Sequence, residues 1–121
     1  MTAIDESIDD AGTAAASFHL NGEPVTVRRR HPHLLAALRE ELDVTSPKDG
    51  CSPSGQCGCC TVLVDGLPRY ACLTLAIEAA GHQITTVEGL ARGEELGPVQ
   101  QAFLDHDAFQ CGYCTSGQML A

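Results

Sequence analysis

Residues 49–73 read DGCSPSGQCGCCTVLVDGLPRYACL, and they contain five of the seven cysteines of the 121-residue chain. The loop from Lys48 to Cys60 holds three glycines, two serines and four cysteines without apolar periodicity, so a hydrophobic core alone cannot order it. Strand-forming residues over 61–64 and 68–72 then flank Asp65-Gly66, a turn signal typical of a β-hairpin. The stretch therefore predicts a glycine-rich loop that leads directly into a hairpin, with Cys72 at the end of a strand.

Similar local signals predict the elements on either side. Asn21-Gly22 between Phe18–Leu20 and Val25–Val27 indicates a second hairpin, and residues 84–87 suit one more short strand. The first predicted helix follows Pro32, with an apolar stripe of Leu34, Leu35, Leu38 and Leu42 and a water-facing side of Arg39, Glu40 and Glu41. The second starts at Pro98, with a stripe of Val99, Ala102, Phe103 and His106 and with Gln100 and Gln101 exposed. A further helix begins after Cys114.

Composition narrows the classes of protein to consider. With 44% hydrophobic and 19% charged residues the chain is in the ordinary globular range, and no apolar run approaches the roughly 18 residues of a membrane helix. A net charge of −9 argues against nucleic acids and anionic membranes as partners. Residues 1–16 are acidic and contain no basic residue, so they lack the features of a secretory signal and predict a flexible tail. We therefore expect a cytoplasmic, reducing location, where clustered thiols bind metals or act in redox chemistry.

The cysteine spacing indicates the chemistry. Cys51, Cys57, Cys60 and Cys72 are spaced C-x5-C-x2-C-x11-C, close to the C-x4-C-x2-C...C of plant-type [2Fe-2S] sites. Such a cluster carries a net negative charge with four thiolates bound, and it needs nearby hydrogen-bond donors. Three glycines of the loop are expected to let it wrap closely and to direct backbone N–H groups at the sulfurs: Gly50, Gly55 and Gly58. Cys59 is expected to be a bystander, because a cluster offers no fifth position, although the sequence C-G-C-C also allows Cys59 to replace Cys60 as the ligand.

Residues 49–73 resemble the iron–sulfur subunit or domain of the molybdenum hydroxylases. This family includes xanthine dehydrogenase, aldehyde oxidoreductases and aerobic carbon monoxide dehydrogenase. QCGYCTSG at 110–117 resembles the second signature of that family, and ITTVEGL at 84–90 is similar to the linker between the two. The resemblance covers about residues 17–121.

This resemblance implies a fold and a set of ligands. The fold is α+β: a β-grasp (ubiquitin-like) [2Fe-2S] domain over 17–90 and the start of an all-α iron–sulfur domain over 91–121. Cys51, Cys57, Cys60 and Cys72 would hold the first cluster. Cys111 and Cys114 would give half of the ligands of a second, and Gln110 would contact a pterin.

The resemblance also implies a role in electron transfer. Electrons would pass from a molybdopterin-binding large subunit through the clusters to a flavin, on an FAD-binding subunit, or to another acceptor. The sequence contains no nucleophile–base set and no phosphate-binding loop, so we expect no substrate chemistry of its own.

Three departures from the family pattern stand out. The first interval is x5 rather than the usual x4, and Cys59 replaces a small residue, usually alanine. The sequence also stops at Ala121, before the C-x-C pair that would complete the second cluster, so we expect an incomplete form of a longer subunit.

Two other readings remain open. Cys57-x2-Cys60 and Cys111-x2-Cys114 could form a four-thiolate zinc site, although 50 residues separate the pairs. Alternatively, Cys111 and Cys114 could act as a thiol–disulfide oxidoreductase, although no βαβ pattern surrounds them. His31 and His33 are expected to flank a helix start rather than to bind metal, and Phe109 and Tyr113 to pack around Cys111.

Overall fold

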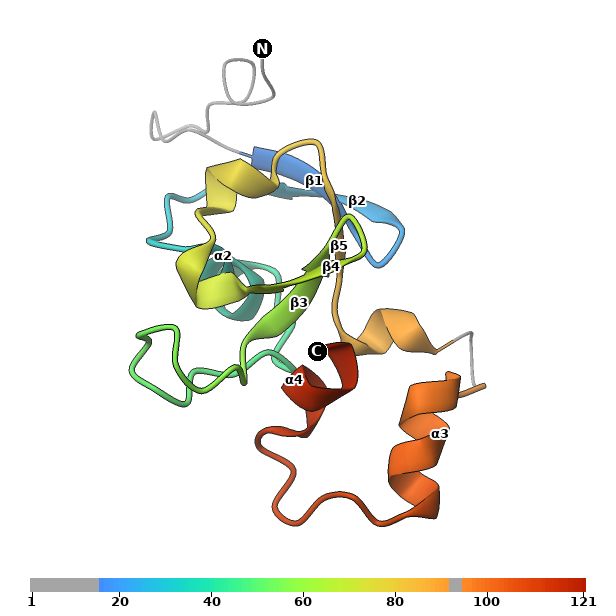
Figure 1. Ribbon diagram of the computed structural model, residues 1–121. Coiled ribbons are helices and arrows are strands. Elements are labelled where there is room, and N and C mark those ends of the chain that lie inside the picture. The colour runs from blue at the N-terminus through green and yellow to red at the C-terminus, as the bar shows by residue number, and fades with distance from the viewer. Residues whose placement is uncertain (1–15, 92–94) are drawn as a thin grey trace.

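A computed structural model describes residues 16–91 and 95–121, and it has a mixed α+β architecture built on one five-stranded sheet (Figure 1). The strand order is β2-β1-β5-β3-β4. The strands are β1 (Ala16–Leu20), β2 (Glu23–Val27), β3 (Thr61–Val64), β4 (Leu67–Tyr70) and β5 (Gln83–Thr85). The predicted α+β class is confirmed.

Both predicted hairpins are present, because their turn residues adopt the backbone that the sequence favours. Asn21 and Gly22 have φ values of 53° and 87°, and Asp65 and Gly66 have 51° and 84°. Positive φ at both central positions gives a turn whose twist matches that of paired strands. β5 pairs in parallel with β1 and antiparallel with β3, and so joins the two hairpins into one sheet. The strand predicted over 84–87 is found one to two residues earlier.

The predicted first helix forms as a short α-helix, α2 (Leu34–Ala36), which continues as a π-helical turn, η1 (Ala37–Glu41). The Leu42 amide donates to the carbonyl of Ala37, five residues back, at 3.1 Å. The leucines of the stripe enter the core together with residues of the sheet; the main members are Phe18, Val27, Leu34, Leu35, Leu38, Val62 and Ile84. Cys60 and Cys72 lie in the same core cluster, so the sheet supports part of the cysteine group directly.

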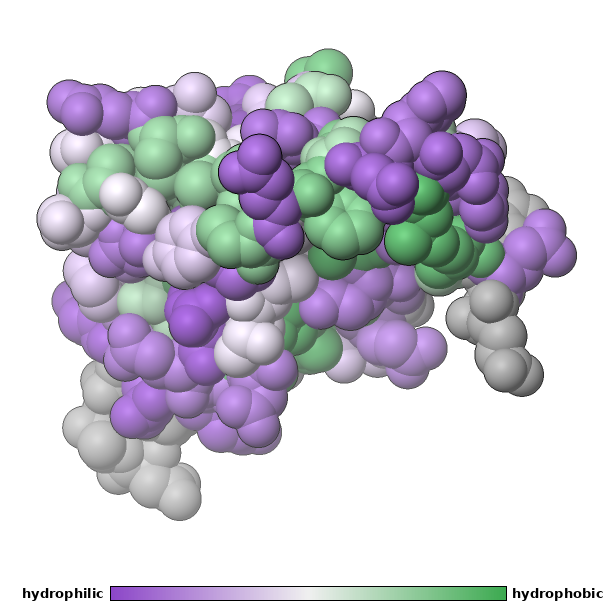
Figure 2. Space-filling view, turned by 90° about the horizontal axis from the view of Figure 1, so that it is seen from below, coloured by the Kyte–Doolittle hydropathy of each residue, from purple (hydrophilic) through white to green (hydrophobic). Residues whose placement is uncertain are grey.

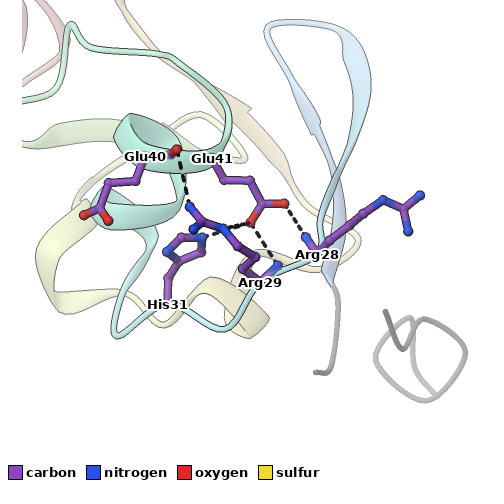
Figure 3. A network of polar contacts seen from close by, with 5 residues as sticks. All are labelled: Arg28, Arg29, His31, Glu40 and Glu41. Atoms are coloured by element: carbon purple, nitrogen blue, oxygen red, sulfur yellow. Dashed lines mark hydrogen bonds and ion pairs between the residues drawn. The ribbon is translucent and has the colours of Figure 1, made fainter. Parts of the chain in front are cut away.

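The helix face predicted to meet water is exposed only at Glu40. Glu41 instead accepts hydrogen bonds from the backbone N–H groups of Arg28 and Arg29 and pairs with Nε2 of His31 at 2.9 Å (Figure 3). Burial alone would raise the pKa of Glu41, but these amides and the His31 ring hold it below its usual value. Glu41 therefore ties the segment after β2 to the helix. The prediction that Glu41 faces water was wrong because its hydrogen-bond partners lie ten or more residues away in the sequence.

Two further local contacts position the residues around this helix. Arg39, also predicted to face water, donates to the carbonyls of Thr45 and Pro47 at 2.7 and 2.9 Å and so holds the chain that leads to the cysteine loop. His33 caps α2, because its Nδ1 accepts from the amide of Ala36 at 3.1 Å. His31 and His33 thus flank the helix start, as predicted.

Short helices complete the described part of the chain. The 3-10 turns are η2 (Ala71–Leu73), η3 (Ala76–Ala79) and η4 (Val87–Leu90), and the α-helices are α3 (Pro98–Asp105) and α4 (Thr115–Leu120). Both α3 and α4 lie at the end of the molecule away from η3 (Figure 1). Both predicted helices in 91–121 are therefore present. Gln100 is not simply exposed: its Oε1 accepts from the Gly97 amide at 2.8 Å, and its Nε2 donates to the Val87 carbonyl at 3.0 Å.

The C-terminal segment leaves much apolar surface uncovered. α3 has no buried residue in the described part of the chain, so its predicted stripe is not a core face there. Figure 2 shows apolar surface lying between hydrophilic residues on this side of the molecule. The exposed large apolar side chains of this segment are Leu96, Val99, Leu104, Phe109 and Tyr113. Phe109 and Tyr113, both predicted to pack around Cys111, are thus partly exposed.

The acidic tail predicted over 1–16 lies outside the described residues except for Ala16, which is buried in β1. None of the helices in the described residues is long and apolar enough to span a membrane.

Candidate metal centre

The glycine-rich loop from Lys48 to Cys60 lies between η1 and β3 and leads into β3; it has no regular secondary structure, as predicted (Figure 1). The Lys48 amide donates to the carbonyl of Cys59 at 2.9 Å and closes the base of the loop. Cys51 and Cys57 lie on the solvent side, whereas Cys60 and Cys72 are buried. Cys72 is on η2 rather than at a strand end as predicted, because β4 stops at Tyr70.

Backbone donors surround the sulfur of Cys51. The amides of Ser54 and Gln56 donate to Cys51 Sγ at 3.1 and 3.5 Å. A turn precedes these donors in the chain, and in this turn Asp49 Oδ1 accepts from the Ser52 amide at 2.7 Å. The Ser54 hydroxyl, together with the neighbouring amides, lowers the pKa of Cys51 to about 6. Cys51 is thus held as the thiolate that a metal centre requires.

Cys60 and Cys72 form the buried side of the group. The Cys72 amide donates to Cys60 Sγ at 3.5 Å. Burial, followed by the side chain of Cys60, raises the pKa of Cys72 to about 11, while the backbone N–H of Gly55 acts in the opposite direction. A thiol in such a place loses its proton readily only next to a positive charge, and iron supplies one. The donor set is therefore chemically suited to a metal centre.

Gly50 lies against two of the loop sulfurs. A Cβ at this position would be 3.0 Å from Cys57 Sγ and 3.3 Å from Cys59 Sγ, so any side chain would displace them. Gly55 is restricted in another way, because a Cβ there would be 2.7 Å from Leu73 Cδ1. Of the three glycines predicted to face the sulfurs, Gly50 is the one whose missing side chain leaves them room.

The second cysteine pair lies in the turn before α4. Cys111 and Cys114 are both exposed, and Gln118 Nε2 donates to Cys114 Sγ at 3.3 Å. Gln110 is exposed beside them. Burial raises the pKa of Cys59, and the charges of Cys57, Cys114 and Cys51 raise it further. Cys114 is therefore close enough to the cysteines of the loop to act on one of them.

Three contacts, none of them predicted, attach this turn and α4 to the cysteine loop and to the segment just before it. The Tyr113 hydroxyl donates to the carbonyl of Asp49, and the Ser116 hydroxyl donates to that of Ser46, each at 2.6 Å. Gly117 lies so close to the loop that a Cβ would be 2.4 Å from the Gly58 carbonyl oxygen. The only sequence signal is the run of small residues after Cys114, which gives no indication of its partner.

Zinc sites and iron–sulfur clusters need different arrangements of sulfur donors. Within residues 16–91 and 95–121, no three His, Cys, Asp or Glu side chains converge on a point where one ion could bind. A four-thiolate zinc site needs all its sulfurs around one ion, whereas a [2Fe-2S] cluster needs two thiolates at each iron. Cys60 lies beside Cys72, an arrangement in which these two thiolates would bind the same iron.

Comparison with known proteins gives an independent view of these cysteines. Residues 86–121 match the family described as a [2Fe-2S] binding domain. The chain is 58% identical over 86 residues to the aldehyde oxidoreductase iron-sulfur-binding subunit PaoA of Escherichia coli O157:H7, covering 71% of this chain and 37% of that protein. It is 44% identical over 105 residues to the nicotinate dehydrogenase small FeS subunit of Eubacterium barkeri, covering 86% of this chain and 66% of that protein.

Solved structures of similar proteins share the fold. Quinoline 2-oxidoreductase from Pseudomonas putida 86 matches with a TM-score of 0.82 and 46% identity, over 88% of this chain and 65% of that chain. Aldehyde oxidoreductase from Desulfovibrio gigas matches with a TM-score of 0.80 and 37% identity, over 88% of this chain and 12% of that chain. The chain thus spans little more than a third of the length of PaoA, and about two thirds of the length of the nicotinate dehydrogenase protein.

These matches confirm the predicted [2Fe-2S] cofactor. The chain belongs to the family of iron–sulfur subunits of the molybdenum hydroxylases.

Proposed function

We propose that the chain carries single electrons from a molybdopterin-containing hydroxylase subunit to a flavin or another acceptor. The observation that carries this proposal is the cysteine group at the end of the sheet, where backbone amides point at the sulfur of Cys51 and Cys60 faces Cys72. A bound [2Fe-2S] cluster supplies one-electron chemistry at such a site. The named relatives, which are subunits of an aldehyde oxidoreductase and of a nicotinate dehydrogenase, support the same role.

The proposed ligands of the first cluster are Cys51, Cys57, Cys60 and Cys72. The inward position of Cys60 and Cys72 and the outward position of Cys51 and Cys57 support this choice, because two thiolates can then approach each iron from opposite sides. Cys111 and Cys114 are proposed as half of the ligands of a second cluster, with Gln110 near a pterin.

The fold and partners are proposed in the same way. Residues 17–90 would be a β-grasp domain, a proposal supported by the strand order β2-β1-β5-β3-β4. Residues 91–121 would begin an all-α domain whose exposed apolar side chains are covered by further helices or by a partner. The proposed partners, in the cytoplasm, are the molybdopterin-binding large subunit of a hydroxylase together with its FAD-binding subunit.

Metal analysis and cysteine variants test the proposal. We expect the anaerobically purified 121-residue chain to contain iron and acid-labile sulfide and to give a [2Fe-2S] electron paramagnetic resonance signal after reduction. Cys60→Ser and Cys72→Ser should each abolish the signal of the first cluster, whereas Cys59→Ser should retain it. Folded protein with zinc and no sulfide would instead support the zinc module. Loss of the cluster in the Cys59 variant alone would reverse the assignment of Cys59 and Cys60.

The thiol–disulfide alternative has its own test. If the exposed Cys111 and Cys114 reduced disulfides, the chain would show reductase activity that Cys111→Ser removes. We expect no such activity. The reduced chain should instead pass its electrons to a one-electron acceptor such as ferricenium.

A further inference from the structure

Lys48 is the only lysine of the chain, and it connects the start of the first cysteine loop to the second cysteine motif. Its Nζ lies 5.7 Å from the centroid of the Tyr113 ring, within the usual range of a cation–π contact. The same Nζ donates to the carbonyl of Ser46 at 3.1 Å. Tyr113 stands between Cys111 and Cys114 in the sequence, so a positive charge from the first motif rests on a side chain of the second.

The ring of Tyr113 brings this charge close to the sulfurs of the loop. Tyr113 Cε2 would lie 3.4 Å from a Cβ at Gly50, and Cys57 Sγ would lie 3.0 Å from the same point. The Tyr113 hydroxyl donates to the carbonyl of Asp49 at 2.6 Å and so fixes the ring in this place. No more than the ring and its contacts on either side therefore separate the Lys48 ammonium from Cys57 Sγ.

A carboxylate of opposite charge lies on the other side of Ser46. Glu88 Oε1 accepts from the Ser46 hydroxyl at 2.8 Å and from the Thr86 hydroxyl at 2.6 Å. Burial alone would raise the pKa of Glu88, but these two hydroxyls, its own backbone and the charge of Lys48 hold it below its usual value. Ser46 thus places two charges at once, because its carbonyl binds Lys48 and its hydroxyl binds Glu88.

We propose that the ammonium of Lys48 raises the reduction potential of the first cluster and that the carboxylate of Glu88 opposes this effect. The inference rests on the proposed ligands of that cluster, among them Cys57. Uptake of one electron adds one negative charge to the cluster and its thiolates, and no bond forms or breaks. A nearby positive charge stabilises the reduced state more than the oxidised state, and a negative charge does the reverse. In a chain of net charge −9, a fixed cation at this place counteracts a field that disfavours reduction.

The experiment is a redox titration of the anaerobically reconstituted chain, followed by electron paramagnetic resonance. We expect the midpoint potential of the first cluster to fall in Lys48→Met, which keeps an unbranched stem without the charge, and to stay near the parental value in Lys48→Arg. In Glu88→Gln the potential should rise.

Arg30→Met is the matched control, because it removes the same charge at a distant place. Arg30 is exposed and lines a cavity together with Ile77 of η3, on the side of the molecule away from α4. Solvent and salt screen a charge at such a position, so the potential should be almost unchanged in this variant.

The outcomes separate this inference from the proposed function. A parent chain that folds without any cluster would overturn the proposed function and the inference with it. A normal cluster with the same potential in Lys48→Met as in the parent would overturn the inference alone. Equal falls in Lys48→Met and Lys48→Arg, or a fall in Glu88→Gln, would also overturn it, because loosened packing rather than charge would then set the potential. If Lys48→Met bound no cluster, Glu88→Gln would decide, since a potential that does not rise there contradicts the inference.

Discussion

The hydroxyl of Tyr113 donates a hydrogen bond of 2.6 Å to the carbonyl of Asp49, across 64 positions of sequence. Asp49 in turn accepts from the Ser52 amide and so shapes the turn around Cys51. Tyr113 lies between Cys111 and Cys114. One side chain from the second cysteine motif therefore stabilises the loop that carries the first, and the two groups of cysteines are mechanically linked.

Replacement of Tyr113 by phenylalanine tests this link. The variant keeps the ring, over which Lys48 Nζ lies at 5.7 Å from the ring centroid, and loses only the hydroxyl. We expect the free energy of unfolding to fall by about 1 kcal/mol, the usual net value of one hydrogen bond. We also expect the first cluster to be lost faster in air, measured by the decay of its absorption.

The matched control for this variant is Tyr70→Phe. Tyr70 is also partly exposed and near the loop, but the described part of the chain offers its hydroxyl no hydrogen-bond partner. If Tyr113→Phe and Tyr70→Phe lowered the free energy of unfolding equally, the hydrogen bond from Tyr113 to Asp49 would not contribute to stability.

Gly117 is the second point of attachment, and it tolerates no side chain. A Cβ would lie 2.4 Å from the carbonyl oxygen of Gly58, which is a backbone atom and cannot move aside cheaply. We expect Gly117→Ala to destabilise the protein by about 1–3 kcal/mol, the range of overpacking effects, despite the higher helix propensity of alanine. Denaturant unfolding gives this value directly.

Gln118→Ala in the same helix is the comparison. Gln118 is exposed and makes one solvent-exposed hydrogen bond, to Cys114 Sγ, so its replacement should change stability by about 0.5 kcal/mol or less. A Gly117→Ala variant as stable as Gln118→Ala would mean that α4 does not pack on the loop as described.

Local signals were sufficient to predict the elements of the sheet. Asn21-Gly22 and Asp65-Gly66 determine their turns through their own backbone preferences, and these operate without the rest of the chain. The leucine stripe after Pro32 likewise follows from helical periodicity. Among the wrong predictions of exposure are those for Glu41 and Gln100, whose polar atoms bond to backbone groups ten or more residues away. A hydrophobic pattern assigns such residues to water because it has no information on distant partners.

In the candidate site too, the features with a local sequence signal could be predicted, and those that depend on distant contacts could not. Ligand spacing along the chain indicated a cluster because the chemistry of iron and sulfide restricts that spacing. The contact between Ser46 and Ser116, seventy positions apart, has no such signature, since serine is common in loops and helix starts. Cys59 was interpreted as a bystander because ligand counting considers only the metal. Its position against Gly50 and Cys57 became evident only in three dimensions.

Glu41 predicts a pH dependence of stability. Its pKa is lowered in the folded protein, against the effect of burial, by the amides of Arg28 and Arg29 and by His31. A carboxyl group with a lowered folded pKa stabilises the fold above its unfolded pKa, near 4.5, and this stabilisation is lost as the pH falls through the folded value. We expect Glu41→Gln to lower the free energy of unfolding by about 1–2 kcal/mol at neutral pH.

The pH profile and a neighbouring variant make this prediction specific. The difference between the parent and Glu41→Gln should shrink as the pH falls below 4.5, because the parental carboxyl is then protonated. Glu40→Gln changes an exposed neighbour on the same turn and should have little effect at any pH. A stability difference that stays constant down to pH about 3 would show that the carboxylate charge is not responsible.

Removal of the cluster should affect the cysteine loop far more than the sheet. The loop has no regular structure, and its order depends on a few contacts such as those of Asp49 and Lys48, whereas β1–β5 share the hydrophobic core. Metal binding and local folding are coupled, so chelation of iron should raise the hydrogen-exchange rates of amides over 50–58, including the Ser54 and Gln56 amides that bond to Cys51 Sγ. Amides of β1 and β3 should exchange at nearly unchanged rates and serve as the internal control. Uniform acceleration over the whole chain would mean that the cluster stabilises the entire fold, and unchanged loop amides would mean that the loop is ordered by protein contacts alone.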